Sequence, residues 1–242
     1  MKLSTLSGKM TLLSVSSNAK TSKSDELYPN TLTAILYLAP HTLGGYGNVC
    51  ADATEGCKQT CLYTAGRGKF NTVQQARVKR TALFFTDLSL FKKSLIEDLK
   101  HFQAYCKEHS LQGYVRLNGT SDIDWQKIKM SATETIFEIY PNLTFYDYTK
   151  NVKRESKFKN YSLTFSYSEA ITITTVKAKL KQDVNVAVVF DVLPSKWKGI
   201  EVVDGDLSDL RPKDKKKVII GLKAKGLAKT IKTDFVIKTV NI

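Results

Sequence analysis

Apolar residues recur along the chain with two different periods. Residues 32–39 form a short apolar run that ends before Pro40, which is typical of a buried strand. Residues 71–84 and 88–107 carry apolar side chains at helical intervals and predict two helices. The rest of the chain alternates between the two patterns. It predicts strands at residues 113–117, 143–148, 161–167, 184–192, 201–203, 218–222 and 235–240, and helices through residues 130–137, 151–158 and 173–181.

Strands separated by helices are the pattern of βαβ units and a mostly parallel sheet. We therefore expect an α/β protein with a partial or complete β/α barrel-like fold. The length of 242 residues suits a single β/α domain, residues 1–242. Within it, residues 1–30 predict a lead-in segment with one short strand, and residues 40–70 a cysteine-cluster loop and the start of a helix.

The composition is that of a globular protein, with 42% hydrophobic and 25% charged residues. No apolar run approaches the roughly 18 residues of a membrane span, and the first residues lack the apolar block of a secretion signal. We expect no membrane partner and a cytoplasmic location.

Lysine and arginine together number 37 against 23 acidic residues, which gives a net charge of +14. Such an excess favours nucleic acid or another polyanion as a partner. It is equally compatible with solvated surface lysines, because lysine outnumbers arginine, the better residue for bidentate phosphate recognition. Residues 213–217 (KDKKK) would contribute to a basic surface.

Three of the four cysteines fall within a dozen residues, in the spacing Cys50-x6-Cys57-x3-Cys61, whereas Cys106 stands apart in a helical stretch. This is a pattern of metal ligands rather than of disulfides. If residues 55–63 begin a helix, Cys57 and Cys61 are four residues apart and share one face. Glycines in the preceding loop let Cys50 fold back towards them. The sequence therefore predicts a metal site formed by Cys50, Cys57 and Cys61.

The ligand count favours an iron–sulfur cluster. Thiolates suit both zinc and iron–sulfur centres, but a closed zinc site has four ligands, often in C-x2-C pairs that this chain lacks. Three cysteines fit a [4Fe–4S] cluster with one iron open to a small molecule or ligated from elsewhere. Zinc, with His41 as a candidate fourth ligand, and reduced bystander cysteines remain the alternatives.

Polar residues follow most of the predicted strands. In parallel sheets the functional groups gather at the carboxyl ends of the strands, so these residues are candidates for a pocket. The alternative is that they are ordinary polar loop residues. They are Arg116, Asn118, Ser121, Asp122, Tyr148, Thr149, Lys150, Ser166, Ser168, Asp191, Asp204, Asp206 and Lys223.

The chain resembles a family of bacteriophage proteins with a gene-product-88-type domain. The resemblance extends from about residue 18 to residue 228 and rests on ILYLAP, GCKQTCLYTAGRG, VRLNGTSDIDW, FYDYTK, LTFSYSEA, VDGDLSDLRP and GLKAKG. It implies a phage-encoded protein of the host bacterial cytoplasm with the three cysteines as its shared cluster. Carried over residue by residue, it also singles out Arg116, Asn118, Ser121, Asp122, Tyr148, Thr149, Lys150, Ser166 and Ser168 as pocket or cofactor-binding residues.

A weaker analogy is to radical S-adenosylmethionine enzymes, which also combine an early three-cysteine [4Fe–4S] cluster with a partial β/α barrel. Their usual C-x3-C-x2-C spacing differs from the spacing found here. The first functional hypothesis is thus an iron–sulfur protein, and as an enzyme it would carry out redox or radical-type chemistry on a small molecule. The alternative is a basic module that binds nucleic acid or a host protein and holds a structural zinc.

Overall fold

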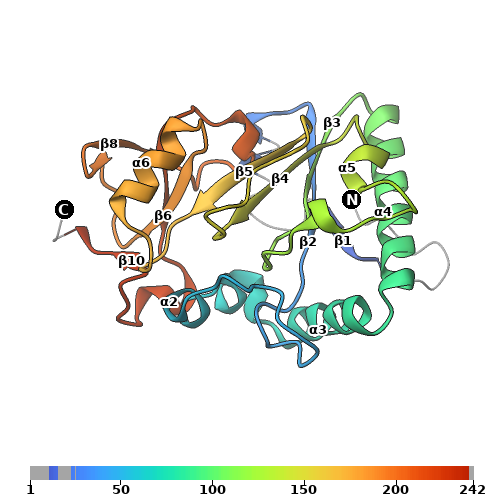
Figure 1. The fold of residues 1–242 in the computed structure, drawn as a ribbon, viewed down its shortest axis with the longest axis horizontal. Helices are drawn as coiled ribbons and strands as arrows, with labels where there is room; N and C mark the ends of the chain where they lie inside the picture. Colours follow the sequence, from blue (N-terminus) through green and yellow to red (C-terminus); the bar gives the residue numbers. More distant parts are fainter. Residues whose placement is uncertain (1–10, 16–22, 25, 240–242) are drawn as a thin grey trace.

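The computed structural model describes residues 11–15, 23–24 and 26–239, and a ten-stranded sheet forms its centre (Figure 1). The strand order is β1-β2-β3-β4-β5-β6-β9-β8-β7, and β10 also pairs with β6. β1 and β7 run antiparallel to their neighbours, and the other described pairs are parallel. The strands are Leu13–Val15 (β1), Thr31–Leu36 (β2), Gln112–Arg116 (β3), Thr144–Thr149 (β4), Tyr161–Ser166 (β5), Val186–Phe190 (β6), Lys196–Trp197 (β7), Ile200–Asp204 (β8), Ile219–Lys223 (β9) and Val236–Ile237 (β10).

The sheet is open, so the structure confirms an α/β fold with a mostly parallel sheet and does not contain a complete barrel. A barrel requires its two edge strands to pair with each other. Here β1 forms one edge and pairs with β2 alone, while β7 forms the other and pairs with β8. Both edge strands are short and antiparallel, and they leave the parallel strands between them as an open sheet.

Helices cover the sheet and bury its apolar side chains. They are Glu55–Gln59 (α2), Asn71–Thr86 (α3), Leu88–Glu108 (α4), Ile136–Ile139 (α5) and Ile173–Lys181 (α6). The long helix α4 packs beside β3, and its buried side chains recur every three or four residues (Figure 1). These side chains join β2, β3 and β4 in one core that includes Phe91, Leu95, Leu99, Phe102, Leu36, Val115 and Phe145.

Two predicted helices differ from the structure. Residues 151–158 form turns and an extended segment, and the helix expected through residues 130–137 is reduced to the four residues of α5. In the first case, side chains from another loop satisfy the backbone, since Lys157 N–H donates to Gln126 Oε1 over 2.7 Å. Part of the predicted lead-in segment, and residue 240 of the last predicted strand, lie outside the described residues.

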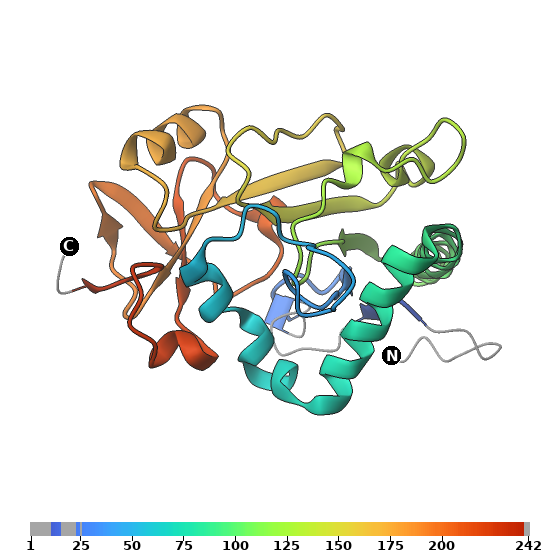
Figure 2. The same cartoon turned by 60° about the horizontal axis from the view of Figure 1, so that its bottom comes forward.

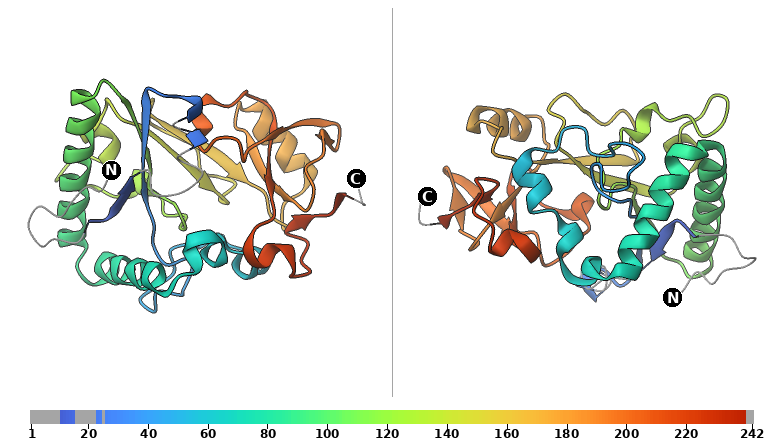
Figure 3. Two further views of the ribbon diagram at one scale, coloured as in Figure 1. Left: turned by 180° about the vertical axis from the view of Figure 1, so that it is seen from behind. Right: turned by 90° about the horizontal axis from the view of Figure 1, so that it is seen from below.

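The carboxyl ends of the parallel strands share one edge of the sheet, and the cysteine segment lies across it. After β2 the chain forms the loop of residues 37–54, continues through α2 and then enters α3. Figure 2 shows this loop and both helices in front of the strands, and Figure 3 shows them from below. The cysteines are thereby brought to the edge at which the polar strand-end residues also lie.

Candidate functional site

One of the three cysteines, Cys61, occupies a different local structure from the one expected. Cys57 lies in α2, whose first turn is capped by Thr54 Oγ1 accepting from Cys57 N–H over 3.3 Å. The helix ends at Gln59, and Cys61 precedes the 3-10 turn Leu62–Thr64 (η1). The expectation that Cys57 and Cys61 share one face of a continuing helix was therefore wrong. Cys50 lies in the preceding loop, as expected.

The Cys50 end of the segment is attached to the loop that follows β3. Asp122 N–H donates to Val49 O over 2.8 Å, and the Cys50 thiol donates to Thr120 O over 3.7 Å. The backbone N–H of His41 in turn donates to Cys50 Sγ over 3.3 Å. The His41 ring contacts the neighbouring Thr42 hydroxyl over 3.4 Å. Cys50 is therefore held in place from two directions.

The Cys57 end is attached to the end of β5. Gly56 N–H donates to Glu169 Oε1 over 2.9 Å. A side chain at position 56 has no room, because a Cβ there would lie 2.5 Å from Thr233 Oγ1 and 2.8 Å from Phe235 Cβ. The glycine thus lets α2 approach the carboxyl edge closely, and Cys57 comes with it.

The three thiols act on one another electrostatically. The pKa of Cys50 is raised to about 12, mainly by burial and in part by charge on Cys61 and Cys57. Burial also raises the pKa of Cys57 and of Cys61, and charge on Cys57 adds to the effect at Cys61. Without a metal, all three are protonated thiols at neutral pH. A metal would have to displace these protons on binding.

Two cations act on these thiols. Lys150, at the end of β4, lowers the pKa of Cys57 and Cys61, and Arg77 of α3 lowers that of Cys61. Lys150 Nζ donates to Ser166 Oγ over 2.9 Å and to Tyr167 O over 3.1 Å, and its Nζ lies 4.7 Å from the centre of the Phe235 ring. Positive charge is thus already in place beside sulfurs that would become anionic on binding a metal.

The described residues contain no group of three or more His, Cys, Asp or Glu side chains arranged to hold one metal ion. A single zinc ion with sulfur ligands at about 2.3 Å would need sulfurs only about 3.8 Å apart. In a [4Fe–4S] cluster each cysteine binds a different iron, so wider separation is required. Three thiols with two cations acting on them have the donor chemistry that such a cluster uses.

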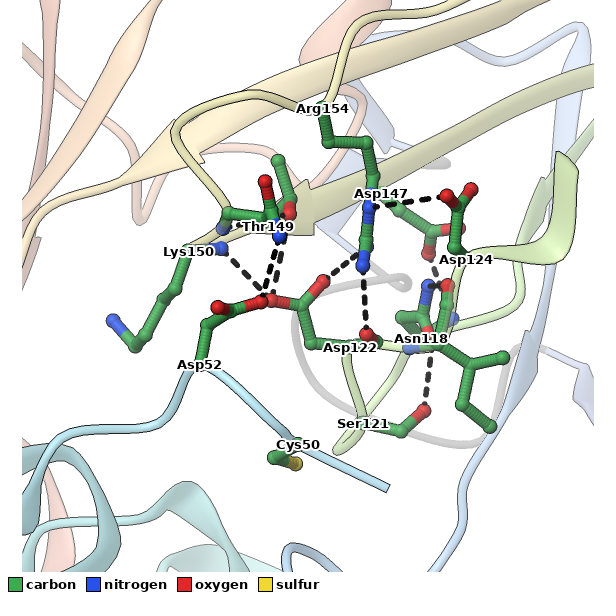
Figure 4. Close-up of polar contacts among 12 residues, drawn as sticks. Cys50, Asp52, Asn118, Ser121, Asp122, Asp124, Asp147, Thr149, Lys150 and Arg154 are labelled. Atoms are coloured by element: carbon green, nitrogen blue, oxygen red, sulfur yellow. Dashed lines mark hydrogen bonds and ion pairs between the residues drawn. The ribbon is translucent and has the colours of Figure 1, made fainter. Parts of the chain in front are cut away.

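Asp122 is the centre of a polar network beside Cys50 (Figure 4). Its carboxylate accepts from Lys150 N–H over 2.8 Å and from the Thr149 hydroxyl over 3.4 Å, and it forms an ion pair with Arg154. Asn118 orders the same loop: its Oδ1 accepts from Ser121 Oγ over 2.8 Å. Of the predicted pocket residues, the structure thus brings together Asn118, Ser121, Asp122, Thr149, Lys150 and Ser166.

The other predicted pocket residues lie apart from this network. Arg116 Nη1 lies 3.4 Å from Asp209 Oδ2, and its guanidinium carbon lies 4.5 Å from the centre of the Tyr148 ring. Ser168 is buried at the end of β5, where its carbonyl accepts from Ile171 N–H over 2.9 Å. Further along the edge, Lys223 pairs with Asp204 over 3.6 Å. Asp206 pairs with Lys225 over 2.6 Å, and Asp191 accepts from the Thr239 backbone over 3.0 Å.

Comparison with protein families identifies the chain. The family model described as gene product 88 matches residues 10–239, nearly the whole sequence. The chain belongs to the gene product 88 family. This is a phage-type protein family, as the sequence motifs predict. No curated protein and no solved structure matched the chain, so the analogy to radical S-adenosylmethionine enzymes gains no support. Among the described helices of this gene product 88 protein, none is both long and apolar enough to cross a bilayer.

Three charged residues of the gene product 88 protein were not foreseen as part of the site. Arg154 follows β4 and neutralises Asp122, and Arg77 lies next to Cys61. Asp147 is buried within β4, where it accepts from Asn118 N–H over 2.7 Å and from the Tyr161 hydroxyl over 3.2 Å. Burial raises the pKa of Asp147 to about 7. The position of Asp147 in a strand was a usable signal, because a carboxyl group inside an apolar run is seldom accidental.

Proposed function

We propose that this protein binds a [4Fe–4S] cluster through Cys50, Cys57 and Cys61 and uses it in redox or radical-type chemistry on a small molecule. The observation that carries the proposal is the convergence of three thiols from a loop and a short helix, beside Lys150 and Arg77, at the carboxyl edge of a parallel sheet. Ligands and substrates of α/β proteins characteristically bind at that edge.

The residues of the chain have distinct parts in this proposal. The three cysteines hold the group, and Lys150 and Arg77 offset its negative charge. When bound, the cluster supplies single-electron transfer and an iron open to a small molecule. Asn118, Asp122 and Thr149 keep the adjoining loops in place, and the Lys150 ammonium and Ser166 hydroxyl present polar groups towards a substrate beside the cluster.

The free thiols agree with the host bacterial cytoplasm, which we propose as the location. All four cysteines lie within the described residues and none forms a disulfide. Iron–sulfur ligation requires such reduced cysteines, and a reducing compartment maintains them.

Metal analysis of anaerobically purified protein tests the proposal. We expect a brown protein with broad visible absorption, containing iron and acid-labile sulfide. Replacing Cys50, Cys57 or Cys61 by alanine should abolish iron binding. The matched control is Cys106→Ala, because Cys106 is buried in α4 against Gly113 and lies outside the site. A colourless anaerobic protein that contains zinc and no iron contradicts the proposal.

A second candidate function is nucleic-acid binding, with a structural zinc at the cysteines. The observation that favours it is a cavity of about 400 Å³ between the loops after β3 and β4. Its walls carry four cations against two acids: Lys127, Lys153, Arg154, Lys157, Asp124 and Glu155. Binding to duplex or single-stranded DNA should then weaken steeply with salt and fall in K153Q/K157Q. An absence of binding at low salt refutes this function.

A further inference from the structure

Arg77 is a buried cation without a carboxylate partner among the described residues. Only 6% of its surface is exposed, and its Nε and Nη1 are buried with no hydrogen-bond partner in the described part of the chain. The ionisable groups that raise its pKa are Tyr37, Cys61 and Tyr63, and none of these is a carboxylate. An uncompensated buried charge is costly, so a guanidinium in this position indicates that negative charge arises beside it.

Aromatic rings hold the guanidinium at a defined position. Its central carbon lies 4.9 Å from the centre of the Tyr37 ring and 5.6 Å from that of Tyr63. Tyr37 directly follows β2, and Tyr63 lies two residues after Cys61. Gly68 closes the site from a further side, since a Cβ there would lie 3.4 Å from Arg77 Nη2. These rings attract a cation but do not neutralise its charge at neutral pH.

Cys61 is the one of these three groups that metal binding makes anionic. We propose that Arg77 is the counter-ion of the cluster and sets its reduction potential. This inference rests on the proposed function. Arg77 acts as a positioning residue: its guanidinium lies over the ring of Tyr63, two residues after Cys61, and its charge acts on the Cys61 thiol. Among the described residues, no carboxylate is found that would neutralise Arg77 before its charge acts on Cys61.

The sign of the effect follows from the charge balance. A [4Fe–4S]²⁺ core with three thiolates carries a net charge of −1, and one-electron reduction makes it −2. A nearby buried cation stabilises the reduced state more than the oxidised state. Removing the charge of Arg77 should therefore move the midpoint potential to a more negative value.

The test is a redox titration monitored by electron paramagnetic resonance, with dithionite supplying the one electron. We expect R77Q to bind iron and to have a more negative midpoint than the wild type, and R77K to lie between them. The control is R80Q on the same helix: Arg80 donates to Thr11 O over 3.3 Å, and the charged groups that act on it are Arg77 and Asp98. R80Q should keep the wild-type midpoint. An R77Q protein with full iron content and the wild-type midpoint overturns the inference.

Unfolding of the iron-free proteins separates this role from a purely structural one. Without the cluster, R77Q removes a charge that has no counter-ion, so its urea midpoint should equal or exceed that of iron-free wild type. A clear drop below both the wild type and R80Q would show that Arg77 serves packing, and would overturn the inference. A wild-type protein that takes up no iron refutes the proposed function itself, whereas an unshifted R77Q potential refutes only the role of Arg77.

Discussion

The ion pair between Asp122 and Arg154 offers a sharp test of the polar network beside Cys50. Both side chains are buried, with exposures of 10% and 8%. Burial raises the pKa of Asp122 even though Arg154 and the Lys150 N–H act in the opposite direction. Desolvation of Asp122 thus outweighs the attraction of Arg154, so the intact pair adds little net stability. Breaking it is a different matter, because the surviving charge stays buried alone.

Asp122→Asn should therefore destabilise the protein by about 3 kcal/mol, the lower end for a broken buried pair, since the amide still accepts from Lys150 N–H. Arg154→Met should also cost about 3 kcal/mol, because it leaves the Asp122 carboxylate buried without its cation. The double variant D122N/R154M should lose only about 1 kcal/mol, which implies a coupling energy of about 5 kcal/mol. Urea unfolding of the four proteins of the cycle measures these values. The matched control is Asp183→Asn, whose partner Lys217 is exposed, with an expected loss of about 0.5 kcal/mol or less. Additive losses in the cycle would refute the reasoning.

Three further variants probe the framework around the site. Burial raises the pKa of Asp147 in the folded protein to about 7, above its ordinary value of 3.8. The contribution of Asp147 to stability is therefore complete below pH 3.8 and is lost as the pH rises through about 7. Asp147→Asn should remove this pH dependence, up to about 4 kcal/mol in urea unfolding, and an unchanged pH profile counts against the assignment. Gly56→Ala should lower the free energy of unfolding by about 1–3 kcal/mol, because its methyl group overpacks against Thr233, and it should also lower the iron content. Adding Thr233→Ala to the same chain should restore part of the stability and part of the iron content. Asp98 accepts from Leu12 N–H over 2.6 Å and from Leu13 N–H over 3.0 Å, so Asp98→Ala should accelerate hydrogen exchange of these amides; unchanged rates would show that β2 alone holds β1.

Periodic segments were the part of the fold that sequence predicted well. The helices α3, α4 and α6 begin within a residue or so of their expected positions. The buried side chains of α4 and most of those of α6 are apolar and recur at helical spacing, whereas the buried side chains of α3 are Arg77 and Thr81. The strands β3 to β6 and β9 were also expected, since apolar runs of their length are typical of buried parallel strands. The local sequence pattern was enough to place an element wherever that element packs against another along its whole length.

The failures arose where distant contacts decide the local structure. Residues 151–158 carry a helix-compatible pattern, but Gln126 binds this segment at two points, through Glu155 O over 3.0 Å and Lys157 N–H over 2.7 Å. Whether the sheet closes depends likewise on its edge strands, and β1 has only three residues and β7 only two. Pairings of that size leave no periodic signal in the sequence.

The cysteine spacing has a physical explanation that no local pattern contains. Cys50 is held by the loop after β3 through Thr120, whereas Gly56, next to Cys57, is held by Glu169 after β5. The stretch between Cys50 and Cys57 therefore has to extend from one strand end to another, which sets a long gap between the first two ligands. Cys61 follows Cys57 more closely because α2 and the turn at Thr60 connect them. The cysteine spacing is thus a property of the sheet beneath it; the spacing is visible in the sequence, whereas the attachment of the cysteines to the strand ends is not.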